Sequence, residues 1–360
     1  MEGGLHGWRR AVHLAGAVLL LVAVNITVGV PWQSLGPHNE GMELGLNFSC
    51  RRARHLMSDI DCLSLFETML TELQPGHVRL ALYWDELEPE RGVFDYSSVD
   101  PYLRLAEQHD VGVVPIIGVK STYRPEFYIP EWVASTILWG APPSDDDRIA
   151  EASLAMLAQV VGHLQAAPAI EAWQVENEPD VHPDGDARGW TVPNSFLARE
   201  VAVVRDADPA GRPVILTDDT SIFYQREWID LLALGDGLGL GFYPRRPGGV
   251  FPWQDELRRF DMGALGSDHW NVMTRARLEG KQAWIVEVQA EPWQTRPASE
   301  LRPDEITSVS PEIMRENVDL ASRTGAERAY LWGVEWWWFQ RVRWQDDSYW
   351  DTARDLLRGN

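Results

Sequence analysis

The chain has 360 residues, 45% of them hydrophobic, and a formal net charge of −22. This hydrophobic content supports a large core and excludes global disorder. Nucleic-acid surfaces need clustered Lys and Arg, so the acidic balance argues against a nucleic-acid partner. Tryptophan is unusually frequent, with 18 residues. Several must belong to the core, but flat aromatic faces also suit sugar rings.

The N-terminal segment predicts a membrane-spanning helix. Residues 11–30 contain no Asp, Glu, Lys or Arg, and a helix of that length matches the hydrocarbon core of a bilayer. Arg9 and Arg10 precede it, so residues 1–10 should stay cytoplasmic and the remainder should lie outside. An uncleaved signal anchor is favoured over a cleaved signal peptide, which would give a secreted protein, because no small-x-small cleavage site follows. Residues 31–42 contain Pro and Gly without periodicity and indicate a linker.

Eight short apolar runs follow, separated by longer segments with helical periodicity. We expect strands at Glu43–Asn47, His77–Leu82, Gly112–Ile117, Ile170–Val175, Pro213–Thr217, Gly237–Phe242, Ala283–Val286 and Arg328–Trp332. The predicted helices include Ser98–His109, Ile149–Gln165, Asn194–Ala207 and Ile313–Thr324. The strands are too apolar to expose one face to solvent. Their alternation with helices predicts an α/β fold: a closed (β/α)8 TIM barrel over residues 43–360. The alternative is an open doubly wound sheet, which would normally show a glycine-rich phosphate turn after its first strand.

Cysteine and histidine patterns predict no metal site and no other cofactor. Cys50 and Cys62 are the only cysteines, and the sequence leaves open whether they form a disulfide outside the cell. The nine His residues form no His-Glu-x-x-His pattern, and no Cys/His spacing typical of metal ligands occurs.

The ends of the predicted strands and the loops after them carry the candidate site, because TIM barrels build their sites there. These residues are polar, aromatic and acidic: Arg79, Trp84, Asn177, Glu178, Tyr243, Glu287, Trp332, Glu335 and Trp336. They include no Ser or Cys nucleophile with a neighbouring base, which argues against acyl transfer by a triad. Glu178 and Glu287 each follow an apolar run. Enzymes that cleave a glycosidic bond use a pair of carboxyl groups at one site.

These motifs resemble those of glycoside hydrolase clan A, the retaining (β/α)8-barrel glycosidases. The resemblance runs from about Glu43 to the end and is nearest in character to families five and forty-two, the cellulase-like and β-galactosidase-like enzymes. Asn177-Glu178-Pro179 is similar to the clan's Asn-Glu-Pro at strand four, and Ile285-Val286-Glu287 to its strand-seven motif. Arg79 and the loop that contains Trp84 resemble the clan's strand-two Arg and the loop after it. Tyr243 resembles its strand-six Tyr, and Trp332 its strand-eight Trp.

The resemblance implies double displacement on β-linked oligo- or polysaccharides, with Glu178 as acid/base and Glu287 as nucleophile. Hydrogen bonds from Arg79 and Tyr243 should keep Glu287 ionised, while burial and the Glu287 charge should raise the pKa of Glu178. Asn177 should bind the sugar 2-hydroxyl, and Trp332 should form the floor under the attacked sugar.

The sequence departs from family five at two substrate-contacting His positions. Residues Ile-Gly-Val-Lys120 stand at the strand-three position, and Gly241 stands two residues before Tyr243. The resemblance to family five is therefore weakest at positions that contact substrate.

Other interpretations stay open. The chain could be a catalytically inactive, membrane-tethered glycan-binding barrel, although keeping both carboxylates with Asn177, Tyr243 and Arg79 argues against it. A metal-dependent barrel hydrolase lacks convincing ligand spacing. Glu176 is expected to support the site from behind, and Glu291 to contact substrate or form a salt bridge. The sequence does not determine the sugar, the linkage, endo or exo action, or the oligomeric state.

Overall fold

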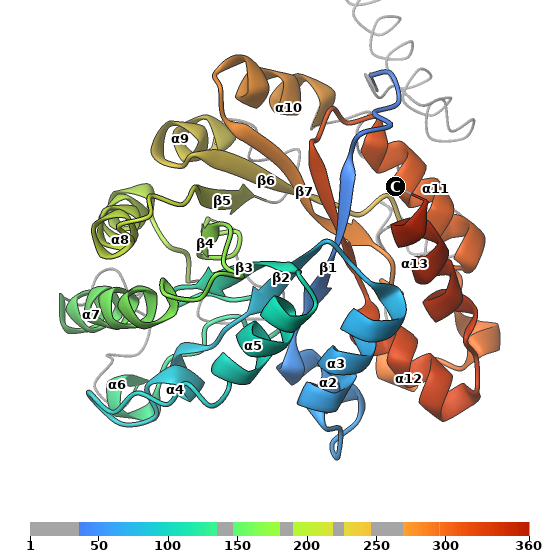
Figure 1. Ribbon diagram of the computed structural model, residues 1–360, viewed down its shortest axis with the longest axis horizontal. Helices are drawn as coiled ribbons and strands as arrows, with labels where there is room; N and C mark the ends of the chain where they lie inside the picture. The colour runs from blue at the N-terminus through green and yellow to red at the C-terminus, as the bar shows by residue number, and fades with distance from the viewer. Residues whose placement is uncertain are drawn as a thin grey trace, which may run out of the picture.

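The fold is a closed barrel of eight parallel strands. The computed structural model describes residues 36–134, 147–180, 190–218, 227–245, 269–294 and 296–359. Each strand pairs with the next along the chain, and β8 pairs with β1 (Figure 1). The strands are β1 (Glu43–Phe48), β2 (His77–Ala81), β3 (Gly112–Ile117), β4 (Trp173–Val175), β5 (Val214–Asp218), β6 (Gly237–Phe242), β7 (Gln282–Gln289) and β8 (Arg328–Trp332). The predicted (β/α)8 barrel is therefore confirmed.

Helices surround the strands in Figure 1. They are α2 (Cys50–Leu56), α3 (Cys62–Leu73), α4 (Trp84–Leu87), α5 (Asp100–Gln108), α6 (Glu131–Ala134), α7 (Asp147–Leu164), α8 (Asn194–Ala207), α9 (Glu227–Leu234), α10 (His269–Leu278), α11 (Pro311–Ser322), α12 (Val334–Trp344) and α13 (Ser348–Arg358). Two 3₁₀ turns, Ala298–Glu300 and Pro303–Glu305, precede α11. Helix α11 begins two residues earlier than predicted, because Ser310 caps it and Pro311 occupies its first turn.

The strands are apolar because both of their faces are covered. Val114, Ile215, Trp284 and Tyr330, on four different strands, form a cluster inside the barrel. The residues on the other strand faces join a larger core with the surrounding helices. A Cβ atom on Gly239 would collide with the side chain of Val286, so only glycine fits there against the packed interior.

An ion-pair cluster closes the amino-terminal end of the barrel. Arg328 contacts Glu171 at 2.6 Å and Glu43 at 2.9 Å, and His77 lies 3.0 Å from Glu171. The chain enters at this same end. Backbone hydrogen bonds join Gly36 and Asn39 to the carboxyl-terminal end of α11, at Arg323 and Ser322. Residues 36–42, predicted as part of a linker, are thus attached to the barrel at its amino-terminal end.

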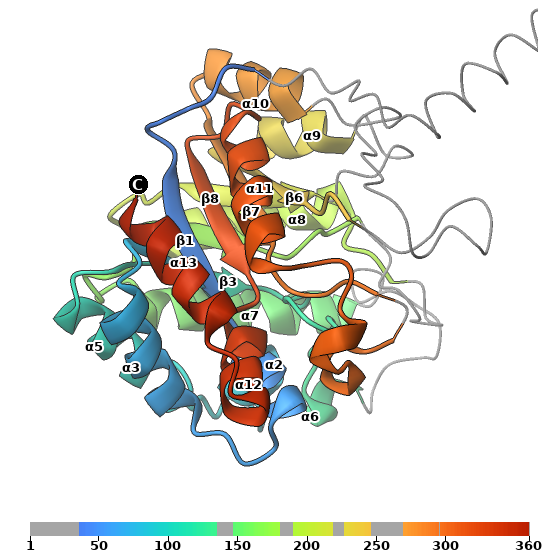
Figure 2. The same cartoon turned by 90° about the vertical axis from the view of Figure 1, so that its right-hand side faces the viewer.

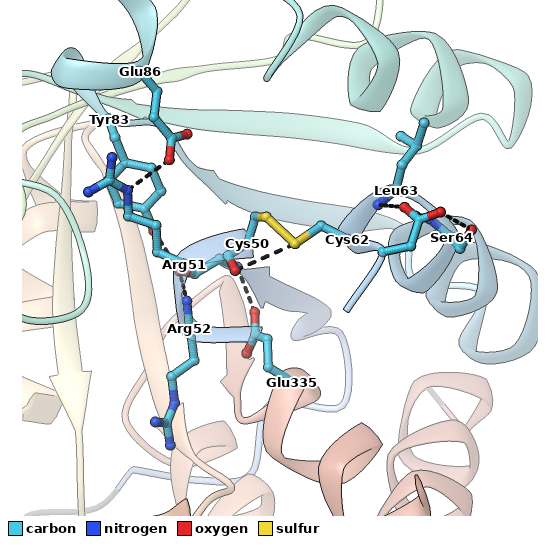
Figure 3. The surroundings of a disulfide bond; sticks show 11 residues. Cys50, Arg51, Arg52, Cys62, Leu63, Ser64, Tyr83, Glu86 and Glu335 are labelled. Atoms are coloured by element: carbon cyan, nitrogen blue, oxygen red, sulfur yellow. Dashed lines mark hydrogen bonds and ion pairs between the residues drawn. A yellow bond between two sulfur atoms is a disulfide. The ribbon is translucent and has the colours of Figure 1, made fainter. Parts of the chain in front are cut away.

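Cys50 and Cys62 form a disulfide that joins the starts of α2 and α3 (Figure 3). Both helices have side-chain caps: Ser49 accepts from Arg52 N, and Asp61 accepts from Leu63 N and Ser64 N. The structure therefore answers the question that the sequence left open. The disulfide holds the segment after β1, which lies at the carboxyl-terminal end of the barrel together with α6 and α12 (Figure 2).

Five strands differ from their predicted bounds, three of them by one residue and β4 and β7 by three residues at one end. Strand β4 begins at Trp173 rather than at Ile170, which makes only an isolated bridge to Val113. Strand β7 extends beyond Val286 to Gln289, and it contains one residue more than each neighbour across a shift in register. Leu240 and Gly241 on β6 pair with Ile285 and Glu287, and a similar shift separates β7 from β8. This irregularity is a β-bulge at Val286–Glu287.

The predicted cytoplasmic tail (residues 1–10) and membrane helix (residues 11–30) lie outside the described residues. Within the ranges that the structure describes, no helix is both long enough and apolar enough to span a bilayer.

Candidate active site

Arg79 on β2 is the centre of a buried hydrogen-bond network at the carboxyl-terminal end of the barrel. Its guanidinium donates to Asn47 Oδ1 at 2.7 Å, Gln174 Oε1 at 2.5 Å, Asn177 Oδ1 at 2.6 Å and Glu287 Oε1 at 2.9 Å. These acceptors belong to β1, to β4 and the loop after it, and to β7. Arg79 is 1% exposed, so its fixed fork of donors sets the spacing of groups from three parts of the barrel.

Glu287 is held at both carboxylate oxygens. Arg79 donates to Oε1, and the Tyr243 hydroxyl donates to Oε2 at 2.6 Å. Burial, followed by the negative charge of Glu287, raises the pKa of Tyr243 well above its ordinary value. Tyr243 therefore stays protonated at neutral pH and remains a donor. Two donors therefore fix the orientation of this nearly buried carboxylate.

The β-bulge explains how Glu287 reaches this position. Along a regular strand, consecutive side chains point to opposite faces. Here Val286 packs in the interior cluster, while the next residue, Glu287, also points inward to Arg79 and Tyr243. The extra residue in β7 permits both orientations, since a bulge re-aims side chains.

Asn177 and Glu178 follow β4 in a constrained backbone segment. Asn177 accepts from Arg79 through Oδ1, and guanidinium groups only donate, which orients the amide. Its side-chain nitrogen, Nδ2, has no hydrogen-bond partner among the described residues, whereas its backbone N–H donates to the Lys120 carbonyl at 2.9 Å. Glu178 adopts a left-handed backbone with φ of 47°, and its N–H donates to Thr217 Oγ1 at 2.9 Å. The half-buried Glu178 carboxylate lies beside Gly241 on β6, at ordinary contact distance from where a Cβ would stand.

Glu176 supports the site from within the protein, as expected. Its carboxylate accepts from Val119 N at 2.8 Å and Lys120 N at 2.6 Å. It fills the space beside Gly118, which has a φ of +136° and where a Cβ would collide with this carboxylate. Burial raises the pKa of Glu176 to about 7. This residue therefore joins the loop after β3 to the loop that carries Glu178.

Trp332 at the end of β8 is fixed by Glu291. The indole N–H donates to Glu291 Oε1 at 3.1 Å, and Arg52 contacts both oxygens of the same carboxylate at 3.0 Å. Of the two roles expected for Glu291, the structure shows the salt bridge. Trp332 lies on the strand opposite β4 in the eight-stranded order, and so opposite the strand that leads to Glu178.

Three residues expected to contact substrate lie inside the protein. Trp84 is 1% exposed and donates to Glu88, and Trp336 is fully buried against Tyr349. Glu335 is 2% exposed and accepts from Ser49 N at 2.6 Å; Figure 3 shows it beside the start of α2. Each lies in a short helix, α4 or α12, that turns it toward the core. In this arrangement all three support the site from within the protein.

Several residues of the site were not identified from the sequence. Asn47 and Gln174 bind Arg79, and Arg52 binds Glu291. Asn47 offered a signal, because it is a polar residue at the end of an apolar run and pairs in register with Arg79. Arg52 offered none, since only the path of α2 brings it to Glu291 in the loop after β7.

Comparisons with known proteins agree with this fold. No protein-family model matches the sequence, and no curated protein matches it. Among solved structures, the chain is similar to a GH5_18 from Bifidobacterium longum subsp. infantis, with 16% identity, a TM-score of 0.57, and coverage of 81% of this chain and 69% of that one. It is also similar to the β-galactosidase from Rahnella sp. R3, with 14% identity, a TM-score of 0.57, and coverage of 83% and 51%.

A third similar structure is the exo-β-1,4-mannosidase from Opitutaceae bacterium strain TAV5, with 18% identity, a TM-score of 0.55, and coverage of 81% and 51%. This chain therefore spans about half the length of the β-galactosidase and the mannosidase. All three neighbours are clan A glycoside hydrolases, and the likeness to them shows that this chain shares their barrel fold.

The buried carboxyl of Glu335 generates a prediction about stability. Burial raises the pKa of Glu335 to about 8, against an ordinary value of 4.5. Between these values the folded state holds a proton that the unfolded state has lost, so the free energy of unfolding falls as pH rises. Glu335→Gln keeps the neutral shape and removes this penalty. The difference in free energy of unfolding between the variant and wild type should therefore grow by at least about 2 kcal/mol in favour of the variant when the pH is raised from about 5 to about 8.5.

Urea denaturation at both pH values measures this gain. Glu67→Gln on the exposed side of α3 is the matched control and should parallel wild type at both pH values. Parallel pH profiles for wild type and Glu335→Gln would contradict a neutral, buried Glu335.

Proposed function

We propose that this protein is a retaining glycosidase that hydrolyses β-linked glycans. The observation that carries the proposal is the double anchoring of Glu287 by Arg79 and Tyr243 in the same network that binds Asn177, next to Glu178. A carboxylate with a purely structural role needs only a counter-ion. The Glu287 carboxylate is instead turned into the end of the barrel by a β-bulge and bound there by two hydrogen-bond donors. The sequence motifs that resemble clan A fall on these same residues.

The proposed reaction has two displacements. In the first, a Glu287 oxygen attacks the anomeric carbon while the bond from that carbon to the glycosidic oxygen breaks, and Glu178 donates its proton to the departing oxygen. In the second, Glu178 takes a proton from water, the water oxygen attacks the anomeric carbon, and the bond to Glu287 breaks. Two inversions leave the configuration of the sugar unchanged, and both carboxyl groups return to their starting states.

The neighbouring groups have matching roles in this proposal. Arg79 and Tyr243 hold the Glu287 carboxylate in position for attack. The free amide N–H of Asn177 donates to the sugar 2-hydroxyl, a contact that strengthens in the transition state. Trp332, fixed by Glu291, provides an aromatic face for the attacked sugar.

The structural neighbours support glycans as the substrate class. One, a substituted GH5_18 from Bifidobacterium longum subsp. longum, was solved in complex with Manβ1-4GlcNAc. Another, xylanase 10B from Thermotoga petrophila RKU-1, was solved in complex with xylobiose. These ligands belong to those proteins, and for this chain they define which glycosides to test first. A glycan-binding barrel without catalysis is the alternative that the test must separate.

Substitution of the two carboxylates tests the proposal. The substrates are the 4-nitrophenyl β-glycosides of mannose, galactose, glucose and xylose. At least one of them should be hydrolysed with retention of the anomeric configuration, as measured by NMR of the product. Glu287→Gln should lower kcat by roughly 1,000-fold or more, because the attacking atom is lost. Glu178→Ala should respond to added azide, which replaces water as an attacking group that needs no base. Turnover that persists in a folded Glu287→Gln protein would contradict the proposal.

We further propose that the barrel lies outside the cytoplasm, tethered by the predicted helix at residues 11–30. The disulfide between Cys50 and Cys62 supports an oxidising compartment. The chain reaches the barrel at its amino-terminal end, where Gly36 and Asn39 are bound. In this proposal, the candidate site at the opposite end points away from the membrane.

Fractionation tests the tether. The full chain should sediment with membranes and resist alkaline extraction, whereas a chain beginning at Gly36 should be soluble and keep its activity. Protease added to intact cells that express the full chain should cleave the barrel. Recovery of the full chain from the soluble fraction with an intact N-terminus would contradict an anchor, and a cleaved N-terminus would establish a secreted form instead.

A further inference from the structure

Glu126 is a further carboxylate at this end of the barrel, and the proposed reaction does not use it. It lies in the turn after β3, where Lys120 and Phe127 pair and Ser121 N–H donates to the Glu126 carbonyl. The Glu126 side chain is 18% exposed, whereas the Lys120 side chain beside it is fully buried.

Lys120 connects Glu126 to the acid/base segment. Its ammonium group donates to the Glu178 carbonyl oxygen at 2.5 Å and lies 3.3 Å from Glu126 Oε2. The other Glu126 oxygen has no hydrogen-bond partner within the part of the chain that the structure describes. By contrast, both oxygens of Glu287 and both of Glu291 already accept from protein donors. Glu126 therefore keeps an oxygen that can accept from a bound molecule.

Glu126 and Glu287 come from opposite sides of the barrel. Strands β3 and β7 are four positions apart in a closed barrel of eight, so the turn after β3 faces β7 across the axis. The two carboxylates also lie close enough to interact electrostatically. Burial first, and then the charge of Glu287, raise the pKa of Glu126, while Lys120 opposes the shift.

The backbone around this turn is constrained. Seven non-glycine residues among those described have positive φ, and three of them, Gln74, Asp110 and Gln345, are at or near helix ends. The other four are Tyr123, Glu126, Glu176 and Glu178. Such conformations persist where the surrounding structure enforces them, and they concentrate at functional sites. The turn with Glu126 and the segment with Glu178 share this property.

We propose that Glu126 is a specificity-determining residue whose free carboxylate oxygen accepts a hydrogen bond from a hydroxyl group at C3 or C4 of the attacked sugar. This inference rests on the proposed function, because it places the anomeric carbon at Glu287. A pyranose ring with C1 at one wall turns C3 and C4 toward the opposite wall, where Glu126 lies. The preferred substrates are then β-glycosides in which that hydroxyl is free.

A purely structural role for Glu126 predicts something different. Without the carboxylate, the buried Lys120 would lose its counter-ion and could displace Glu178 through the shared contact. All substrates would then be slowed by a similar factor, whatever hydroxyls they carry. The two roles are separated by comparing substrates that differ in one hydroxyl.

The experiment measures kcat/KM for the 4-nitrophenyl β-glycoside that wild type hydrolyses fastest and for its 3-deoxy and 4-deoxy forms. Wild type should lose roughly 10- to 100-fold for one of the deoxy substrates, as expected for a hydrogen bond to a charged group. Glu126→Gln keeps an acceptor for Lys120 but carries no charge, and Glu126→Ala carries no acceptor. The loss caused by the missing hydroxyl should shrink in Glu126→Gln and nearly vanish in Glu126→Ala.

Sensitivity to the 4-hydroxyl would place Glu126 at a chain end, because a 1,4-linked sugar has no free hydroxyl there, and sensitivity to the 3-hydroxyl would allow internal cleavage. Glu131→Gln on the exposed face of α6 is the matched control and should discriminate like wild type. A folded Glu126→Ala protein that discriminates as strongly as wild type would overturn the inference. If wild type hydrolyses no glycoside at all, the proposed function fails instead, so the two failures are distinct.

Discussion

The site depends on one buried cation, Arg79. It binds Asn47, Gln174, Asn177 and Glu287 at once, and thus fixes the relative positions of β1, β4 and β7 at one end of the barrel. Removing one partner of a buried ion pair costs about 3–5 kcal/mol, because a charge is left without compensation. That is a large share of the roughly 5–15 kcal/mol that stabilises a typical domain. The ion pair between Arg79 and Glu287 therefore stabilises the folded barrel and also positions the carboxylate of the candidate site.

The remaining features place the other groups around this network. The bulge in β7 turns Glu287 inward next to Val286. Glu176 binds the loop after β3, and Lys120 in that loop binds the carbonyl of Glu178. Strands β3 and β4 therefore present Glu126 and Glu178 as one connected unit. Across the barrel, Trp332 is held by Glu291 and Arg52.

The sequence predicted the fold and the centre of the site because both are local patterns. The apolar strands have characteristic lengths, and Arg79, Asn177, Tyr243 and Glu287 each lie at or near a strand end. The bulge was not predictable, since it is a mismatch between strands distant in sequence. Trp84, Glu335 and Trp336 were placed in the site by proximity along the chain, but α4 and α12 turn them into the core. Lys120 and Glu126 were missed as a pair because their contact depends on the path of an irregular turn.

The most direct test is peptide mass spectrometry after incubation of a chain beginning at Gly36 with 2,4-dinitrophenyl 2-deoxy-2-fluoro-β-glycosides. These compounds form the glycosyl intermediate of a retaining enzyme and slow its hydrolysis. We predict a single covalent adduct on the peptide that contains Glu287, absent from Glu287→Gln. An adduct on Glu126 or Glu291, or steady turnover of ordinary glycosides without any adduct, would contradict the assignment of Glu287 as the nucleophile.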